Sequence, residues 1–247
     1  MSAPGLAAGA AERFWIKPDY RARAPHSFDA GGAERYWTPE RIARSHLHQH
    51  PVYALCRRLL RARGAQSFLD VGSGPGTKVA ELIAPLCGDV VLVDQPSSQP
   101  LVARLLPGAR FVPANLEAPE LSLGRGFDLV VCADVLEHLA DPTRCVRFIR
   151  EHLAPGGRAV ISTPERDRLR GRDCRESPHP EHVREWNAVE FRAFLEHSGL
   201  AVLRQRLLPP QRVGRCEGIA AQLFGGIARR ARWSACQALV CRRAEAR

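Results

Sequence analysis

The chain has 247 residues, of which 45% are hydrophobic and 25% charged, and its formal net charge at pH 7 is +10. These values are close to those of an average soluble domain, and they exclude a wholly disordered chain, a collagen-like repeat and a small disulfide-stapled scaffold. No stretch approaches 18 consecutive apolar residues, and residues 1–17 lack the pattern of a secretory signal, so we expect a cytoplasmic protein without a membrane span.

Arginine supplies nearly all of the positive charge. Only Lys17 and Lys78 are lysines among the 36 basic residues, a ratio typical of a GC-rich genome, so selection for a polyanionic partner need not be invoked. The two ends of the chain are basic and the middle is acidic, and only 6% of the residues are aromatic. A nucleic-acid-binding surface more often combines a basic stripe with interleaved aromatic side chains. We therefore do not expect a nucleic-acid partner.

Eight cysteines are spread along the chain without a C-x-x-C pair, and several lie in apolar runs. A disulfide framework is typical of short secreted chains, so we expect reduced, buried thiols. Two groupings could be considered for a metal: the alternate histidines of SHLHQH at 45–50, and Cys174 with His179 and His182. Alternate residues of a helix do not share a face, and the second group is irregularly spaced. We expect no metal site.

From residue 67 onward, runs of β-branched and apolar residues alternate with runs of helical periodicity. The expected order is strand 67–71, helix 77–86, strand 89–96, helix 99–106, strand 109–114, strand 127–134, helix 141–157, strand 158–163, helix 187–200 and strands 201–208 and 234–242. Strands separated by helices in this way predict a doubly wound α/β fold, in which a mostly parallel sheet carries helices on both faces.

Three segments lie outside this alternation. Residues 1–62 precede the first strand and are helical in parts, residues 164–186 are polar and loop-like, and residues 216–231 are interpreted as a helical insertion. We interpret residues 1–62 as an extension or lid on a domain formed by residues 63–247. The first two segments border the strand ends where open α/β sheets bind ligands, so both are candidate lid and substrate elements.

The most informative run is FLDVGSGPGTKVAEL at residues 68–82. Its three glycines permit a sharp strand-to-helix turn and a close approach of a ligand to the backbone. The G-x-G-x-G spacing differs from the G-x-G-x-x-G of dinucleotide sites, and Asp70 would disfavour a diphosphate but suit an ammonium group. Asp94 ends the next strand, where it can accept two hydrogen bonds from a ribose diol. A Rossmann dehydrogenase is the nearest structural alternative.

Further runs extend this pattern: VVLVDQ (90–95), PANLE (113–117), FDLVVCADVLEHLADP (127–142) and LAPGGRAVIST (153–163). Together with FLDVGSGPG they resemble the successive motifs of the class I S-adenosylmethionine-dependent methyltransferases, over about residues 66–206. The resemblance implies S-adenosyl-L-methionine as the cofactor. It also implies a Rossmann-like sheet of seven strands, mostly parallel, with the last strand antiparallel.

The resemblance further implies roles for individual residues. Asp70 would serve the methionine end of the cofactor, directly or through ordered water, and Asp94 would bind the ribose hydroxyls. Asn115 departs from the commoner aspartate, but its amide can still meet the adenine. The other expected cofactor-binding residues are Gly72, Ser73, Gly74, Gln95, Leu116, Cys132 and Ala133.

Methyl transfer from a sulfonium is an in-line displacement, so positioning and electrostatics can supply most of the acceleration. A hydroxyl acceptor also needs a base. His138, just after the fourth strand, and His182, in the segment 164–186, are the candidate catalytic bases. Alternatively, His138 packs or caps the following helix, and His182 is a hydrogen-bonding loop residue.

The expected function is methylation, most simply at oxygen, of a small-molecule or sugar-containing metabolite. The run RDRLRG (166–171) with HVREW (182–186) resembles methyltransferases of polysaccharide and secondary-metabolite pathways. Two alternatives stay open: an RNA methyltransferase, favoured only by the basic flanks, and a regulatory protein that binds the cofactor without transferring a methyl group. Four aromatic residues could cover the cofactor, grip an apolar acceptor or pack on the sheet edge: Trp15, Tyr20, Tyr36 and Trp37.

Overall fold

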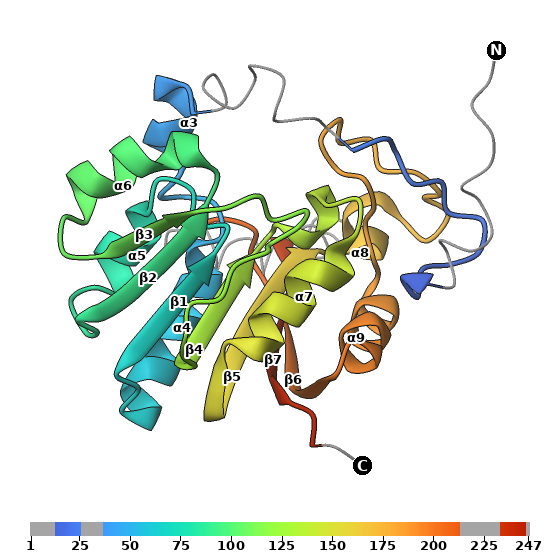
Figure 1. Ribbon diagram of the computed structural model, residues 1–247. Helices are drawn as coiled ribbons and strands as arrows, with labels where there is room; N and C mark the ends of the chain where they lie inside the picture. The colour runs from blue at the N-terminus through green and yellow to red at the C-terminus, as the bar shows by residue number, and fades with distance from the viewer. Residues whose placement is uncertain (1–12, 26–36, 213–232, 246–247) are drawn as a thin grey trace.

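A computed structural model describes residues 13–25, 37–212 and 233–245 of the chain. Within these residues a single twisted sheet of seven strands carries helices on both faces (Figure 1). The insertion expected at 216–231 and the side chain of Tyr36 lie outside the described residues.

The seven strands confirm the expected topology. They are β1 (Ser67–Val71), β2 (Asp89–Asp94), β3 (Arg110–Pro113), β4 (Phe127–Ala133), β5 (Leu153–Pro164), β6 (Leu200–Leu208) and β7 (Cys236–Arg243). Across the sheet their order is β3-β2-β1-β4-β5-β7-β6. The pairs from β3 to β5 are parallel, whereas β7 is antiparallel to both β5 and β6. The sheet is therefore mostly parallel, with its last strand antiparallel.

The helices form one layer on each face of this sheet. They are α3 (Pro39–Arg44), α4 (His50–Arg63), α5 (Thr77–Leu82), α6 (Gln99–Leu105), α7 (Pro142–Glu151), α8 (Arg166–Arg170) and α9 (Ala188–His197), with short 3₁₀ turns η1 (Pro96–Ser98) and η2 (Leu136–His138). Helices α4, α5 and α6 share one buried cluster, whereas α7 and α9 share the other with residues 13–25. Because side chains alternate along a strand, β1 directs Phe68 to the first cluster and Leu69 to the second.

Helix α4 packs directly on the sheet. Its side chains Val52, Leu55 and Cys56 are buried in the same cluster as Phe68 of β1 and Leu129 of β4. These apolar residues lie on one face of the helix, as expected for an amphipathic helix that covers a sheet. We therefore propose that residues 50–63 belong with the sheet domain and that any lid lies in the residues before them.

The strand β5 begins earlier than the sequence predicts. The helix expected over 141–157 ends at Glu151, and β5 starts at Leu153, before the Pro-Gly-Gly run. The register between β4 and β5 shifts between Phe127 and Leu129, so a bulge accommodates these residues. A Cβ at Gly157 would lie 2.7 Å from the carbonyl oxygen of Phe127, so the strands can approach here only with glycine. The run that predicted a helix stop thus lies within a strand.

The segment 164–186 is not the simple polar loop that its composition predicts. It contains α8, and His182, Val183, Arg184, Glu185 and Trp186 are all buried. Polar side chains can be buried here because they bond to one another and to the backbone. The segment 164–186 is therefore packed against the protein beside the carboxyl end of β4, where the Val183 N–H donates to the Glu137 carbonyl.

The cysteines agree with the expectation of reduced, buried thiols. Each cysteine in the described part of the chain is free, and all of these except Cys174 are buried. None of the helices in residues 13–25, 37–212 and 233–245 is long and apolar enough to cross a membrane.

Candidate functional site

A cavity of about 620 Å³ crosses the carboxyl ends of β3, β2, β1 and β4. Its volume and its position are those of a small-molecule site in an open α/β sheet. The loops that follow these strands supply most of the lining: Gly72, Ser73, Gly74, Asp94, Gln95, Pro96, Pro113, Ala114, Asn115, Leu116, Glu117, Ala133, Asp134, Val135, His138 and Leu139. Three residues from elsewhere complete it, namely Trp37, Gln49 and Lys78.

The glycine loop between β1 and α5 forms one wall of the cavity. Gly72, Gly74 and Gly76 have φ angles of 84°, 57° and 75°, which L side chains adopt only with strain. A Cβ at Gly74 would lie 2.7 Å from the ring of Trp37, so glycine lets this ring lie directly on the loop. The indole Nε1 of Trp37 donates a hydrogen bond to the Ser98 hydroxyl at 3.0 Å. Trp37 is thus held over the cavity, as the sequence led us to consider.

The carboxylate of Asp94 connects the glycine loop to the end of β2. It accepts hydrogen bonds from the Gly74 N–H at 2.6 Å, the Gln95 N–H at 2.7 Å and the Ser98 hydroxyl at 3.3 Å. Burial raises the pKa of Asp94, although these hydrogen bonds oppose the shift. Each carboxylate oxygen offers two acceptor sites, so one site remains free on Oδ2, and a diol that donates twice would also have to replace the long hydrogen bond from Ser98.

Asp70 lies behind the cavity and is not among its lining residues. It is fully buried, and its Oδ2 accepts a hydrogen bond from the Tyr53 hydroxyl of α4 at 2.8 Å, whereas Oδ1 has no partner among the described residues. Burial raises the pKa of Asp70 to about 7. Direct contact with a cofactor would require a rearrangement, so a water-mediated contact fits this geometry better.

The remaining expected cofactor residues divide into two groups. Gln95, Asn115, Leu116 and Ala133 line the cavity. Cys132 does not, because its side chain points to the opposite face of the sheet and is buried in the cluster that contains α7. The alternation of side chains along β4 accounts for this difference between neighbouring residues.

Two charged lining residues did not stand out in the sequence. Lys78 is 6% exposed, and its ammonium donates a hydrogen bond to the Ser45 carbonyl at 3.1 Å. Asp134 has a φ of 54°, a conformation uncommon outside glycine and often found at functional sites. In the sequence, the position of Asp134 directly after the fourth strand could have identified it as a candidate site residue. Lys78 could have been noticed as one of two lysines in an arginine-rich chain.

The two candidate bases lie next to each other, although they come from distant parts of the chain. The rings of His138 and His182 are 4.8 Å apart and nearly perpendicular. His138 lines the cavity, whereas His182 lies behind it and is 7% exposed. Burial, and secondarily the charge of His182, lowers the pKa of His138 to about 4, which favours a neutral ring.

A buried network fixes His182. Its Nδ1 lies 2.7 Å from Oε1 of Glu185, which also accepts hydrogen bonds from the Ser177 hydroxyl and from Arg170. Burial alone would raise the pKa of Glu185, but the hydrogen bonds from His182 and Arg170 lower it to about 2. The backbone N–H of Glu185 in turn donates to the Tyr20 hydroxyl at 3.0 Å. Tyr20 therefore supports the candidate site from behind instead of covering a ligand.

The chain is similar in sequence to known methyltransferases. A ubiquinone biosynthesis O-methyltransferase of Albidiferax ferrireducens is 33% identical over 141 residues, which cover 54% of this chain and 55% of that protein. A probable S-adenosylmethionine-dependent methyltransferase of Mycobacterium tuberculosis is 32% identical over 169 residues, covering 67% and 56% respectively. The chain spans about a third to three fifths of the length of the curated relatives it matches.

Solved structures share the fold. The 1,6-didemethyltoxoflavin-N1-methyltransferase of Burkholderia thailandensis superposes with a TM-score of 0.61 at 18% identity, covering 99% of this chain and 94% of that one. A family model described as a methyltransferase domain matches residues 44–205, which include the glycine loop, Asp94 and both histidines. The chain therefore belongs to the class I S-adenosylmethionine-dependent methyltransferase family.

Proposed function

We propose that this domain transfers the methyl group of S-adenosyl-L-methionine to an oxygen atom of a small-molecule acceptor. One observation carries the proposal: a single cavity joins Asp94 and Asn115, after β2 and β3, to His138, after β4. A cofactor that lies across the carboxyl ends of β3, β2 and β1 would place its methyl group beside His138. The similarity to ubiquinone biosynthesis O-methyltransferases supports oxygen as the acceptor atom.

The lining suggests how the cofactor would lie. Asp94 would accept hydrogen bonds from the ribose diol, and Asn115 and Leu116 would border the adenine. The methionine part would then extend over the glycine loop toward Ala133. Lys78, a buried cation in the same lining, is placed to attract the methionine carboxylate.

The reaction requires few groups from the protein. The acceptor oxygen attacks the methyl carbon in line with the carbon–sulfur bond, and sulfur retains the electron pair to give S-adenosylhomocysteine. The acceptor proton would pass to Nε2 of His138, because Nδ1 donates its proton to the Glu181 carbonyl at 2.9 Å. A ring with a pKa of about 4 is a weak base, so the acceptor is expected to be an acidic hydroxyl or one acidified by a neighbouring group.

A screen of candidate acceptors for S-adenosylhomocysteine release, with the product identified by mass spectrometry, tests the proposal. We expect turnover with a small hydroxylated molecule and loss of that turnover in Asp94→Ala. Methylation of RNA, with binding that weakens steeply as salt is raised, would replace the proposed substrate class. Cofactor binding without turnover on a broad panel would instead favour a regulatory protein.

A further inference from the structure

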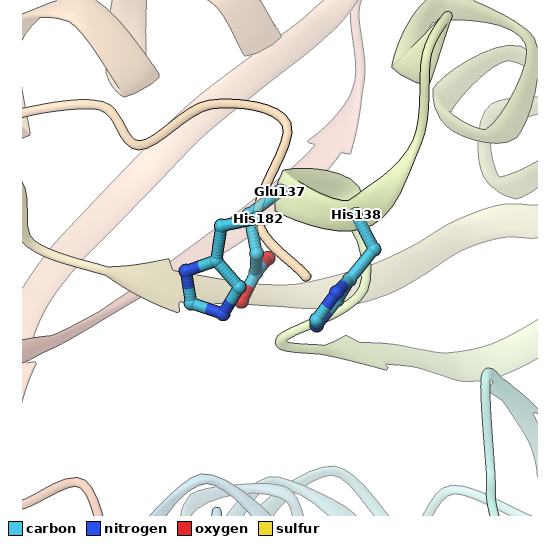
Figure 2. Close-up of side chains that lie close together, drawn as sticks. All are labelled: Glu137, His138 and His182. Carbon is cyan, nitrogen blue, oxygen red and sulfur yellow. The ribbon is translucent and has the colours of Figure 1, made fainter. Parts of the chain in front are cut away.

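We infer that Glu137, His138 and His182 form a binding site for a divalent transition-metal ion beside the cavity. One ligand atom from each of these residues lies within 4.8 Å of the other two. Figure 2 shows the carboxylate and the two rings gathered between η2 and the segment that carries His182. The three side chains come from neighbouring positions in η2 and from a distant segment, so tertiary packing brings them together.

Both histidines are held in the tautomer that a metal requires. The Glu181 carbonyl can only accept a hydrogen bond, so Nδ1 of His138 carries the proton and Nε2 has the free lone pair. The Glu185 carboxylate likewise accepts from Nδ1 of His182, which leaves its Nε2 free. Metal-binding histidines typically donate their second ring N–H to a carboxylate or a backbone carbonyl. Here His138 donates to a backbone carbonyl and His182 donates to a carboxylate.

The buried carboxylate of Glu137 also indicates a bound cation, independently of the two histidines. Its side chain is fully buried, and Oε2 accepts a hydrogen bond from the Thr163 hydroxyl at 3.0 Å. Oε1 has no hydrogen-bond partner among the described residues. A buried oxygen without a partner is costly and calls for an explanation. A cation bound between Oε1 and the two imidazoles would provide that partner.

The ligand set indicates the kind of metal. Two imidazole nitrogens and one carboxylate oxygen suit Zn²⁺, Co²⁺, Fe²⁺ or Mn²⁺, and they suit Mg²⁺ less well. In a tetrahedral site with bonds of about 2.1 Å, ligand atoms lie about 3.4 Å apart, so the three side chains would close by roughly an ångström. His138 lines the cavity, so a further coordination position would open toward the acceptor.

The role of this site rests on the proposed methyl transfer. A metal-bound acceptor hydroxyl loses its proton more readily, as metal-bound water does. The proton would then pass to solvent, because both Nε2 lone pairs would be coordinated. The carbon–oxygen bond forms and the carbon–sulfur bond breaks as before.

Titration of chelator-treated protein with Co²⁺, followed by absorption spectroscopy, tests the site without cofactor or acceptor. We expect one Co²⁺ per chain and a spectrum without the intense thiolate band that binding to cysteines would produce. Glu137→Gln and His182→Gln should each weaken binding by about tenfold or more. Glu137→Gln keeps the shape and an acceptor for Thr163, so its thermal unfolding should resemble that of the parent. His197→Gln, at an exposed histidine in α9, is the matched control.

Absence of saturable binding, a thiolate spectrum, or equal affinity in the parent and both folded variants would overturn the site. Because the titration needs no turnover, it is independent of the proposed reaction. A second arm measures methyl transfer before and after chelation, with Mn²⁺ added back. Recovery of activity by Mn²⁺ in the parent but not in Glu137→Gln supports the catalytic role. Full activity of the chelated parent contradicts that role and returns the function of base to His138 alone.

Discussion

The two ends of the cavity are built from different parts of the chain. At the end of the cavity proposed for the cofactor, which contains Gly74 and Asp94, the Gly74 N–H donates a hydrogen bond to Asp94, only 20 residues away. Gly74 follows β1, and Asp94 ends the parallel neighbour β2. At the end proposed for the acceptor, which contains His138, the ring of His138 donates to the Glu181 carbonyl 43 residues away, and behind it the Glu185 N–H donates to the Tyr20 hydroxyl 165 residues away. One end is therefore local in the sequence, whereas the other depends on long-range packing.

This difference suggests that cofactor binding and acceptor recognition depend on different parts of the chain. The loops after β1 and β2 form as soon as the parallel strands pair, so any chain with this topology can present the same cofactor surface. The acceptor end requires the segment 164–186 to fold against both η2 and residues 13–25. We therefore expect substitutions in that segment to change the choice of acceptor without changing the affinity for the cofactor. If the two ends are independent, a substitution at one end should leave the function of the other unchanged.

The largest expected effect concerns the anchor of the acceptor end. Arg166 is 1% exposed and forms two hydrogen bonds with the Glu190 carboxylate, at 2.7 and 3.0 Å. Arg166→Leu leaves this carboxylate without its cationic partner and with only the backbone N–H groups of Lys17 and Asn187, so the free energy of unfolding should fall by about 3–5 kcal/mol. Urea denaturation measures the change. The double variant Arg166→Leu/Glu190→Gln should recover part of the loss. A loss below about 1 kcal/mol would show that the pair does not anchor the segment.

The second prediction separates catalysis from cofactor binding. His138→Gln removes the ring nearest the acceptor but no group after β1, β2 or β3, so kcat should fall by about 100-fold or more. The affinity for S-adenosylhomocysteine should change less than about twofold, as calorimetry can measure. His197→Gln should retain the parent kcat. Loss of cofactor affinity in His138→Gln would mean that the two ends are not independent.

The reciprocal prediction concerns Asp94. Asp94→Ala removes charge-assisted hydrogen bonds worth about 1.5–3 kcal/mol each, so S-adenosylhomocysteine should bind at least about tenfold more weakly. Asp94→Asn keeps the shape of the side chain, so its affinity for S-adenosylhomocysteine should lie between those of Asp94→Ala and the parent. Calorimetric titration of the three proteins gives the comparison. Equal affinities would remove Asp94 from the cofactor end.

The last prediction concerns the pH dependence of stability. Burial raises the pKa of Asp70 to about 7, above its ordinary value of 3.8, so between these values the folded state holds a proton that the unfolded state has lost. Stability should therefore fall as the pH rises from about 4 to about 7. Asp70→Asn removes this contribution and should flatten the decline. Chemical denaturation at several pH values checks it, and an identical slope in both proteins would contradict the assigned pKa.

The sequence predicts the fold and the cofactor end more fully than the acceptor end. Strand patterns are local signals, and they correctly predicted the seven strands, whereas the antiparallel β7 followed from the family resemblance. Local patterns could not show that the Pro-Gly-Gly run lies in a bulge of β5, because the bulge depends on pairing with β4. They also could not show the burial of Glu137 or its proximity to His182, since that contact joins two distant segments.

A crystal structure of the protein with S-adenosylhomocysteine tests the central claim most directly. We expect the ribose diol within hydrogen-bond distance of Asp94, the adenine beside Asn115 and Leu116, and the sulfur near Ala133 on the side of His138. The ligand would then occupy the cavity across β3, β2, β1 and β4. Binding elsewhere, or a pose in which the sulfur points away from His138, would contradict the proposed arrangement of cofactor and acceptor.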